Sequence, residues 1–369
     1  MPEYSTRPEG IKSCANLTRW MRTRTSLLLL LAALTTACGG SSPSSPDGGG
    51  TPPPAPGSPV SGFLFYDENG NGVADSNEIV RLPSVGVAIG GQNATTATGG
   101  RFSIASVPNG AQTGQTRPDT LPTYYTATSI SLTIPSTEDV PVPARLVIGS
   151  RNRPNVYLAF GDSITDGEGS SGGGYLGYLE SQVKNFWGKA DVVNDGDPGT
   201  RSNTGRARLP GHLAEIRPAY TLILYGTNDW NEPACRNAFP CYTIDSLRSM
   251  IQDTKSAGAW PIVATIPPVN PNYVDRQAAE RNAWVKNMND LIRSMAAAER
   301  CPVAEVYGDF MKQPSLPPLY ADDKHPNNTG YQIIAQSFFR AITQPLAAAS
   351  AAAEEEASPA LFLPPGRRR

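Results

Sequence analysis

The sequence predicts a three-layer α/β domain with a parallel sheet, preceded by a small all-β sandwich domain. Across residues 151–345, short apolar runs alternate with segments that carry apolar residues at helical spacing, a pattern typical of a parallel sheet with helices on both faces. Across residues 60–150, β-rich runs are separated by glycine, proline and asparagine turns, which favours an immunoglobulin-like or prealbumin-like sandwich. The net charge of −2 gives no support for a nucleic-acid partner.

Residues 1–38 have the order of an export signal. Arginines precede the apolar stretch 27–34, which is too short to span a bilayer and suits a signal peptide. The small residues that end in Cys38 resemble a bacterial lipoprotein cleavage site, so we expect an exported cell-envelope protein anchored to a membrane by lipid on Cys38. Thr35 stands where that pattern usually has leucine, which leaves an ordinary signal peptide and a secreted protein as the alternative. Met21 would make a conventional start.

Two further segments lack the composition of a folded core. Residues 39–59 contain only Gly, Ser, Pro, Thr, Ala and one Asp, which predicts a flexible tether that holds a folded part away from a membrane. Residues 346–369 are alanine-rich, then acidic, then basic, and we expect them to form a disordered tail.

The loop from Asp67 to Glu78 carries the ligand spacing of an EF-hand. Oxygen side chains stand at loop positions one, three, five, nine and twelve, glycine stands at six, and the residue at seven offers its backbone carbonyl. The candidate ligands are Asp67, Asn69, Asn71, Val73, Asp75 and Glu78. Because strands flank the loop, it resembles the calcium-binding repeats of bacterial surface adhesins of the SdrD B-like type, and the resemblance implies a structural Ca²⁺. A polar hairpin tip is the alternative.

Elements of the α/β domain follow from apolar spacing. The predicted strands are 156–160, 192–193, 222–224, 262–266 and 303–306. The predicted helices carry the apolar sets Ile244, Leu247 and Ile251, then Trp284, Met288, Leu291 and Met295, then Ile334, Phe338 and Ala341.

Ser163 follows the first of these strands, in the segment 161–167, and a glycine-rich stretch and a helical segment come after it. A residue in that place lies at the edge where open α/β sheets bind their ligands. Three more polar blocks, 194–199, 225–229 and 322–327, follow in order, and the first two of these also end apolar runs. These four blocks resemble the SGNH (GDSL-type) hydrolase family over residues 155–343, and the resemblance implies a flavodoxin-like strand order.

A serine hydroxyl needs a base at neutral pH, and the chain contains only two histidines, His212 and His325. His212 is expected to start a helix, and nothing near it indicates a catalytic role. Asp322 stands three residues before His325, where it can accept the ring N–H and fix the tautomer. Asp323 competes for that role, and the family pattern Asp-x-x-His implies Asp322. Ser163 is the candidate nucleophile.

The resemblance also implies three donors for the oxyanion that forms during acyl transfer. These are the backbone N–H groups of Ser163 and Gly199 and the side-chain amide of Asn228. We expect the neighbouring Asp162 and Asp229 to form structural hydrogen bonds in their loops.

The expected function is an exported serine esterase that hydrolyses carboxylic esters through an acyl-serine intermediate, without a metal or other cofactor in the reaction. The resemblance favours a short acyl group on a small-molecule or polysaccharide ester, including acetylated carbohydrate. Lysophospholipase or thioesterase action is the alternative within the class, and a non-catalytic envelope glycan-binding protein is the alternative outside it. Trp230 either lines the substrate pocket or packs within its loop.

The cysteines after the signal segment are expected to be structural. Cys235 and Cys241 lie in one loop, and export implies an oxidising compartment, so a disulfide between them is predicted. A zinc site would need more ligands than these cysteines and a distant histidine offer. Cys301 is expected to be buried as a small apolar side chain.

Overall fold

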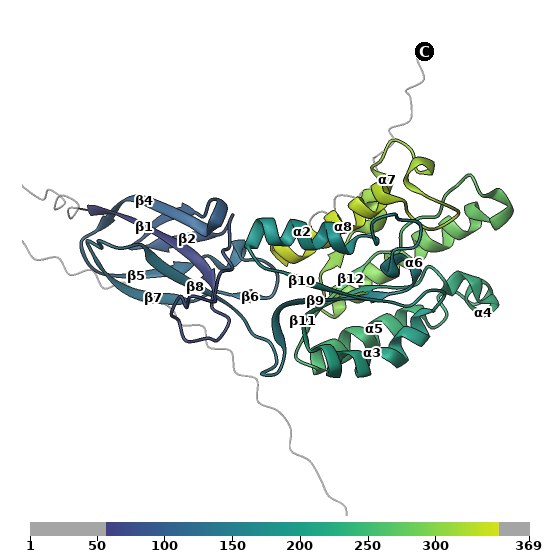
Figure 1. The fold of residues 1–369 in the computed structure, drawn as a ribbon, viewed down its shortest axis with the longest axis horizontal. Helices are drawn as coiled ribbons and strands as arrows, with labels where there is room; N and C mark the ends of the chain where they lie inside the picture. Colours follow the sequence, from purple (N-terminus) through teal and green to yellow (C-terminus); the bar gives the residue numbers. More distant parts are fainter. Residues whose placement is uncertain (1–56, 347–369) are drawn as a thin grey trace, which may run out of the picture. The chain divides into compact units, whose positions relative to one another are not determined.

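The computed structural model describes residues 57–346, which comprise a β-rich part and an α/β part within one compact unit of the chain (Figure 1). The predicted signal segment, Cys38, most of the predicted tether and nearly all of the predicted tail lie outside the described residues. None of the helices between residues 57 and 346 is long and apolar enough to cross a membrane.

The β-rich part consists of two four-stranded sheets, in the orders β4-β1-β8-β6 and β3-β2-β5-β7. All neighbouring strands are antiparallel except β1 and β8, which are parallel. The strands are β1 (Gly57–Tyr66), β2 (Gly86–Ile89), β3 (Gln92–Thr95), β4 (Arg101–Pro108), β5 (Gly110–Thr116), β6 (Tyr125–Thr126), β7 (Ser129–Ile134) and β8 (Val140–Leu146). Short 3₁₀ turns occur at η1 (Thr98–Gly100) and η2 (Pro118–Thr120). The expected all-β architecture is therefore present, and its immunoglobulin-like or prealbumin-like type stays a prediction.

Strand β1 begins inside the segment that its composition predicts to be a tether. Gly57 pairs with Pro108 and Ser58 with Val107 on β4. Backbone pairing to a neighbouring strand does not depend on apolar side chains, so a linker-like composition conceals the start of this strand.

The α/β part is built on a five-stranded, all-parallel sheet in the order β10-β9-β11-β12-β13. The strands are β9 (Arg153–Gly161), β10 (Asp191–Gly196), β11 (Pro218–Leu224), β12 (Trp260–Ala264) and β13 (Val303–Ala304). The second strand in sequence lies at the edge beside the first, and the remaining strands follow on the other side. This is the flavodoxin-like order, so the expected fold class is confirmed.

Helices cover both faces of this sheet (Figure 1). They are α1 (Ser163–Asp166), α2 (Leu176–Trp187), α3 (Ser202–Ile216), α4 (Pro233–Asn237), α5 (Thr243–Ser256), α6 (Ala278–Ala298), α7 (Val306–Met311) and α8 (Asn328–Thr343), with 3₁₀ turns η3 (Asp229–Asn231), η4 (Val274–Arg276) and η5 (Pro317–Leu319). Along β9, Tyr157 and Ala159 join the core that contains α2 and α8, while Leu158 and Phe160 join the core that contains α3, α5 and α6. This alternation shows that β9 is buried on both faces.

Three local predictions were wrong. The run 303–306 is a strand only to Ala304, and Val306 instead begins α7. In α6 the residue that completes the buried stripe is Ile292, while Leu291 is only partly buried. His212 lies well inside α3 instead of starting a helix.

Candidate active site

Ser163 lies at the carboxyl end of the central strand β9, as the first residue of α1. Asp162 caps this short helix, and its side chain accepts the backbone N–H of Ile164 at 3.0 Å. Gly161 packs so closely that an added Cβ would lie 2.5 Å from the carbonyl oxygen of Leu224. The sharp strand-to-helix turn thus requires glycine beside the serine, and it leaves Ser163 2% exposed.

His325 lies between Ser163 and Asp322. Ser163 Oγ is 2.9 Å from His325 Nε2, and His325 Nδ1 is 2.7 Å from Asp322 Oδ2. Asp322 Oδ1 also accepts the backbone N–H groups of Lys324 and His325. Although partial burial opposes ionisation, these hydrogen bonds from His325 and Lys324 lower the pKa of Asp322. The carboxylate therefore holds the imidazole with Nε2 directed at the serine hydroxyl, the arrangement that lets a histidine act as a base.

The other candidate acid, Asp323, and the other histidine, His212, do not take part in this chain of hydrogen bonds. Asp323 lies near Lys324 at 3.7 Å and Arg281 at 3.9 Å. His212 Nδ1 lies 2.9 Å from Asp195 Oδ2. Of the two histidines, only His325 has a hydrogen bond to Ser163.

The sequence did not identify Glu168, which also contacts His325. Its Oε2 lies 3.0 Å from His325 Nε2, the nitrogen that Ser163 contacts. The loop that carries Glu168 lies close to the histidine, since an added Cβ on Gly169 would lie 2.7 Å from Pro326 O and 3.0 Å from His325 Cβ. Only folding brings this loop and the segment before α8 together, so local spacing does not predict the contact.

The expected oxyanion donors lie on loops at the same edge of the sheet. Asn228 is 4% exposed and its Nδ2 donates to Thr200 O at 3.0 Å, which connects it to the turn that contains Gly199. That donor has a second N–H group for a substrate oxygen. Gly199 has φ 77° and open space where a Cβ would stand, so the turn suits glycine and leaves room beside its backbone.

Two buried aspartates hold these loops in place. Asp229 accepts the Ser202 backbone N–H and the hydroxyls of Ser202 and Thr243 at 2.6–2.9 Å, and so joins the starts of α3 and α5 to the Asn228 loop. Burial raises the pKa of Asp229, and burial together with nearby Asp229 raises the pKa of Asp162 to about 7, against the effect of its hydrogen bond from Ile164.

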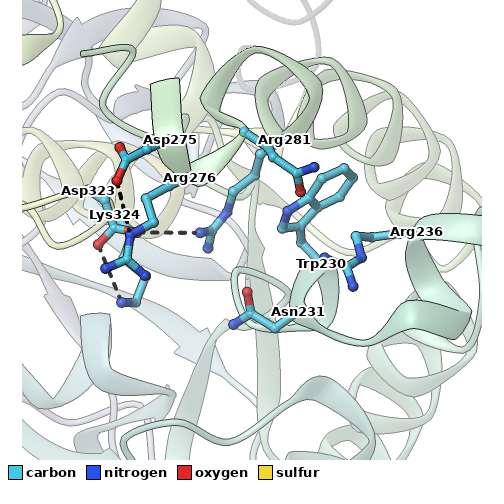
Figure 2. Close-up of a pocket in the computed structure, with 9 residues that line it drawn as sticks. Trp230, Asn231, Arg236, Asp275, Arg276, Arg281, Asp323 and Lys324 are labelled. Atoms are coloured by element: carbon cyan, nitrogen blue, oxygen red, sulfur yellow. Dashed lines mark ion pairs between the residues drawn. The ribbon is translucent and has the colours of Figure 1, made fainter. Parts of the chain in front are cut away.

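A cavity of about 330 Å³ opens next to the residues of this site (Figure 2). Asp323 and Lys324, which lie between Asp322 and His325 in the chain, line it together with Trp230. Trp230 lines this cavity and also packs against Trp284, with ring centroids 6.1 Å apart, so both of the places expected for it apply.

A disulfide joins Cys235 to Cys241 at the end of α4. Cys301 is free and buried. Within the described part of the chain, no group of three or more His, Cys, Asp or Glu side chains is arranged to hold a metal ion.

The predicted calcium loop is closed by its own hydrogen bonds. Asp67 accepts the backbone N–H groups of Gly70 and Gly72, and Glu78 accepts those of Glu68, Asn69 and Asp75. The side-chain amides of Asn69 and Asn71 donate to Asp75 Oδ2 at 2.7 and 2.9 Å. Asp67 is 3% exposed and Glu78 is fully buried, although they are carboxylates.

Comparisons with known proteins agree with this geometry. Residues 159–333 match the model of the GDSL-like Lipase/Acylhydrolase family. The thioesterase 1/protease 1/lysophospholipase L1 of Escherichia coli K12 is 29% identical over 184 residues, 49% of this chain and 80% of that protein. The esterase TesA of Pseudomonas aeruginosa is 32% identical over 136 residues, 36% of this chain and 66% of that protein.

Among solved structures, a catalytic mutant of an acetylxylan esterase from Geobacillus stearothermophilus is similar, with 21% identity and a TM-score of 0.43 over 53% of this chain and 96% of that one. The family match begins on β9 and includes Ser163, Asn228 and His325. Residues 159–333 therefore match the GDSL-like (SGNH) lipase/acylhydrolase family, and the chain is a carboxylic ester hydrolase of this type.

Proposed function

We propose that the chain is an exported serine esterase that removes short acyl groups, including acetyl groups on carbohydrate, through an acyl-enzyme on Ser163. The observation that carries this proposal is the pair of contacts from Ser163 Oγ to His325 Nε2 at 2.9 Å and from His325 Nδ1 to Asp322 Oδ2 at 2.7 Å. These contacts join a nucleophile, a base and an orienting acid in one line.

The geometry supports a two-step reaction. Ser163 Oγ attacks the ester carbonyl carbon while His325 Nε2 takes the hydroxyl proton, and the same nitrogen then gives that proton to the departing alcohol oxygen. Water attacks the acyl-serine with His325 again as base, which releases the carboxylic acid and restores the serine. Asn228 Nδ2 and the backbone N–H groups of Ser163 and Gly199 would donate to the negatively charged oxygen of both tetrahedral intermediates.

The polar lining of the neighbouring cavity supports a hydrophilic alcohol part of the ester. The cavity beside the site is lined by charged and amide side chains together with Trp230, which suits a hydroxylated alcohol part better than a long hydrocarbon chain. The activities in the name of the Escherichia coli relative support a second candidate, hydrolysis of thioesters or lysophospholipids. A purely glycan-binding role is disfavoured because the hydrogen-bonded chain is complete.

The test is hydrolysis of p-nitrophenyl acetate, butyrate and palmitate by the wild type and by Ser163→Ala. The proposal predicts acetate as the best substrate and a loss of turnover of about 10⁶-fold in the variant, because the nucleophile is absent. Ser256→Ala, on the exposed last turn of α5, is the matched control and should keep full activity.

Circular dichroism must show that Ser163→Ala is folded. Asn228→Ala should lose roughly 2.7–4 kcal/mol of transition-state stabilisation, the usual cost of one oxyanion donor. Full activity in folded Ser163→Ala would refute the mechanism, and a preference for palmitate would favour the second candidate.

We also propose that Ca²⁺ occupies the loop from Asp67 to Glu78. The fit rests on the donor set, which consists of oxygen atoms, and on charge. Asp67 and Glu78 are buried carboxylates and Asp75 lies beside them, while Arg145 Nε lies 3.8 Å from Asp67 Oδ2 and Arg81 Nη1 donates to the carbonyl of Glu78 at 2.6 Å. Bound Ca²⁺ would neutralise this excess of negative charge and would play a structural part only.

A further inference from the structure

The cavity beside the candidate active site has an unusual balance of charge (Figure 2). Four of its lining side chains are cationic, namely Arg236, Arg276, Arg281 and Lys324, and only two are acidic, namely Asp275 and Asp323. The ion pairs among them are long, since Arg276 lies 3.8 Å from Asp275, Lys324 lies 3.7 Å from Asp323 and Arg281 lies 3.9 Å from Asp323. The cavity is therefore a positively charged surface whose cations are only loosely paired.

Arg281 is a buried cation of this cavity whose hydrogen bonds are incomplete. It is 4% exposed, and its Nη2 donates to Thr227 O at 2.8 Å, but its Nε has no hydrogen-bond partner. Asp323, at 3.9 Å from Nη1, is too far away for a good hydrogen bond. A buried guanidinium with an unpaired N–H group is unfavourable, so a ligand oxygen that accepts from this group would be bound strongly.

The cavity is also well placed to meet a substrate. Asp323 and Lys324 connect the proposed acid Asp322 to the proposed base His325, and Arg281 contacts the residue before Asn228. The cavity thus adjoins residues that flank the proposed active site, and Trp230 offers an apolar surface within it.

We propose that this cavity is an anion subsite, which binds a carboxylate or phosphate on the alcohol part of the ester. The inference rests on the proposed esterase function and narrows its substrate class to acidic esters. Guanidinium groups bind both anions through paired N–H donors, so their chemistry alone does not separate a uronic acid from a phosphorylated alcohol.

Binding can be measured apart from catalysis, in the full chain with Ser163→Ala. Isothermal titration calorimetry compares trigalacturonate with neutral xylotriose, and glycerol 3-phosphate with glycerol. We expect at least one anion to bind about tenfold or more tightly than its neutral counterpart, and this preference to weaken as salt rises.

Exposed arginines of the cavity allow variants that keep the fold. Adding Arg236→Gln and Arg276→Gln should reduce the anion preference about tenfold, whereas Arg206→Gln, an exposed arginine of α3 that does not line the cavity, should leave it unchanged. A preference for trigalacturonate identifies a carboxylate source, and a preference for glycerol 3-phosphate identifies a phosphate source. Equal binding of anionic and neutral ligands, or no response to the double substitution, would overturn the subsite.

The wild-type assay on p-nitrophenyl acetate separates this inference from the proposed function. Hydrolysis without an anion preference would contradict the proposed subsite and support the proposed esterase function. An anion preference without hydrolysis of any ester would support the anion-binding cavity and contradict the proposed esterase function.

Discussion

At the scale of single residues, His325 Nε2 lies close to both the hydroxyl of Ser163 and the carboxylate of Glu168. A neutral imidazole with its proton on Nδ1 can accept the hydroxyl proton of Ser163, whereas the carboxylate of Glu168 at 3.0 Å is attractive only when Nε2 carries a proton. A protonated Nε2 cannot serve as the base. We therefore expect Glu168 to oppose the base role proposed for His325, and Asp322 on the other side of the ring to support it.

This competition gives opposite predictions for two carboxylates that contact the same ring. Glu168→Gln should keep or raise kcat/KM on p-nitrophenyl acetate, because the variant removes the charge that favours protonated Nε2. Asp322→Asn should lower kcat by about 10⁴-fold, because the wrong tautomer is then favoured. A large loss in folded Glu168→Gln would show that Glu168 acts in catalysis instead.

Asp162 should make stability depend on pH. Its pKa is about 7 in the folded protein and about 3.9 in an unfolded chain, so between these values the folded state holds more protons. The free energy of unfolding should consequently fall as pH rises from about 4 to 7, by on the order of 4 kcal/mol from this residue.

Urea denaturation at pH 4.5 and at pH 8 checks whether the free energy of unfolding falls as pH rises. Asp162→Asn keeps an oxygen that can accept the Ile164 N–H but does not titrate, so its stability should change less between the two pH values than that of the wild type. An equal change in both proteins would contradict the prediction.

The sequence identifies the site residues that act within short segments and misses those that depend on distant contacts. Ser163, Asp322 and His325 stand in local blocks with recognisable spacing, although choosing Asp322 over Asp323 needed the family pattern. Glu168 was missed because two loops meet only in the fold. Arg281 could have been noticed, because it shares the buried face of α6 with residues such as Trp284 and Met288, where a charged side chain is exceptional.

At the scale of elements, apolar patterning predicts buried strands well and exposed ones poorly. The central strands β9, β11 and β12 are buried on both faces and were predicted from their apolar runs. Apolar patterning does not predict β3 and β5, because Gln92–Thr95 and Gly110–Thr116 are mostly polar and are held by backbone pairing to β2 and β7.

The loop from Asp67 to Glu78 should gain stability from Ca²⁺. A ligand that binds only the folded state at 100 times its Kd adds about 2.7 kcal/mol to the free energy of unfolding. Glu68 lies within this loop, and its Oε1 accepts hydrogen bonds from Asn155 Nδ2 at 2.7 Å and from Lys189 Nζ at 3.2 Å in the α/β part. We therefore expect the effect of Ca²⁺ to appear in the melting of the whole chain.

Thermal melts of the full chain with Ca²⁺ and with a chelator measure this effect. Asp67→Ala should abolish the difference, and Asn77→Ala, at an exposed loop position that is not a predicted ligand, should preserve it. Identical wild-type melts with and without Ca²⁺ would rule out the site.

At the scale of the whole molecule, the β-rich and α/β parts share a packed boundary. Tyr124 stacks on Trp260 with ring centroids 4.2 Å apart, and its hydroxyl donates to Pro261 O at 2.8 Å. The backbone N–H of Arg81 donates to the carbonyl of Trp187, the last residue of α2. One aromatic stack and two hydrogen bonds thus connect residues of the two parts.

The predicted anchor, Cys38, lies outside the described residues. The order of arginines, leucines and small residues before this cysteine predicts cleavage and lipid attachment there, and the segment 39–59 would then tether the esterase to a membrane. Expressed in a bacterium that processes lipoproteins, the wild type should appear in the membrane fraction and Cys38→Ser in the soluble fraction. Cys14→Ser is the matched control, because this cysteine precedes the apolar stretch and should not alter the distribution. Equal solubility of the wild type and Cys38→Ser would leave an ordinary signal peptide as the better interpretation, without affecting the predictions for the active site.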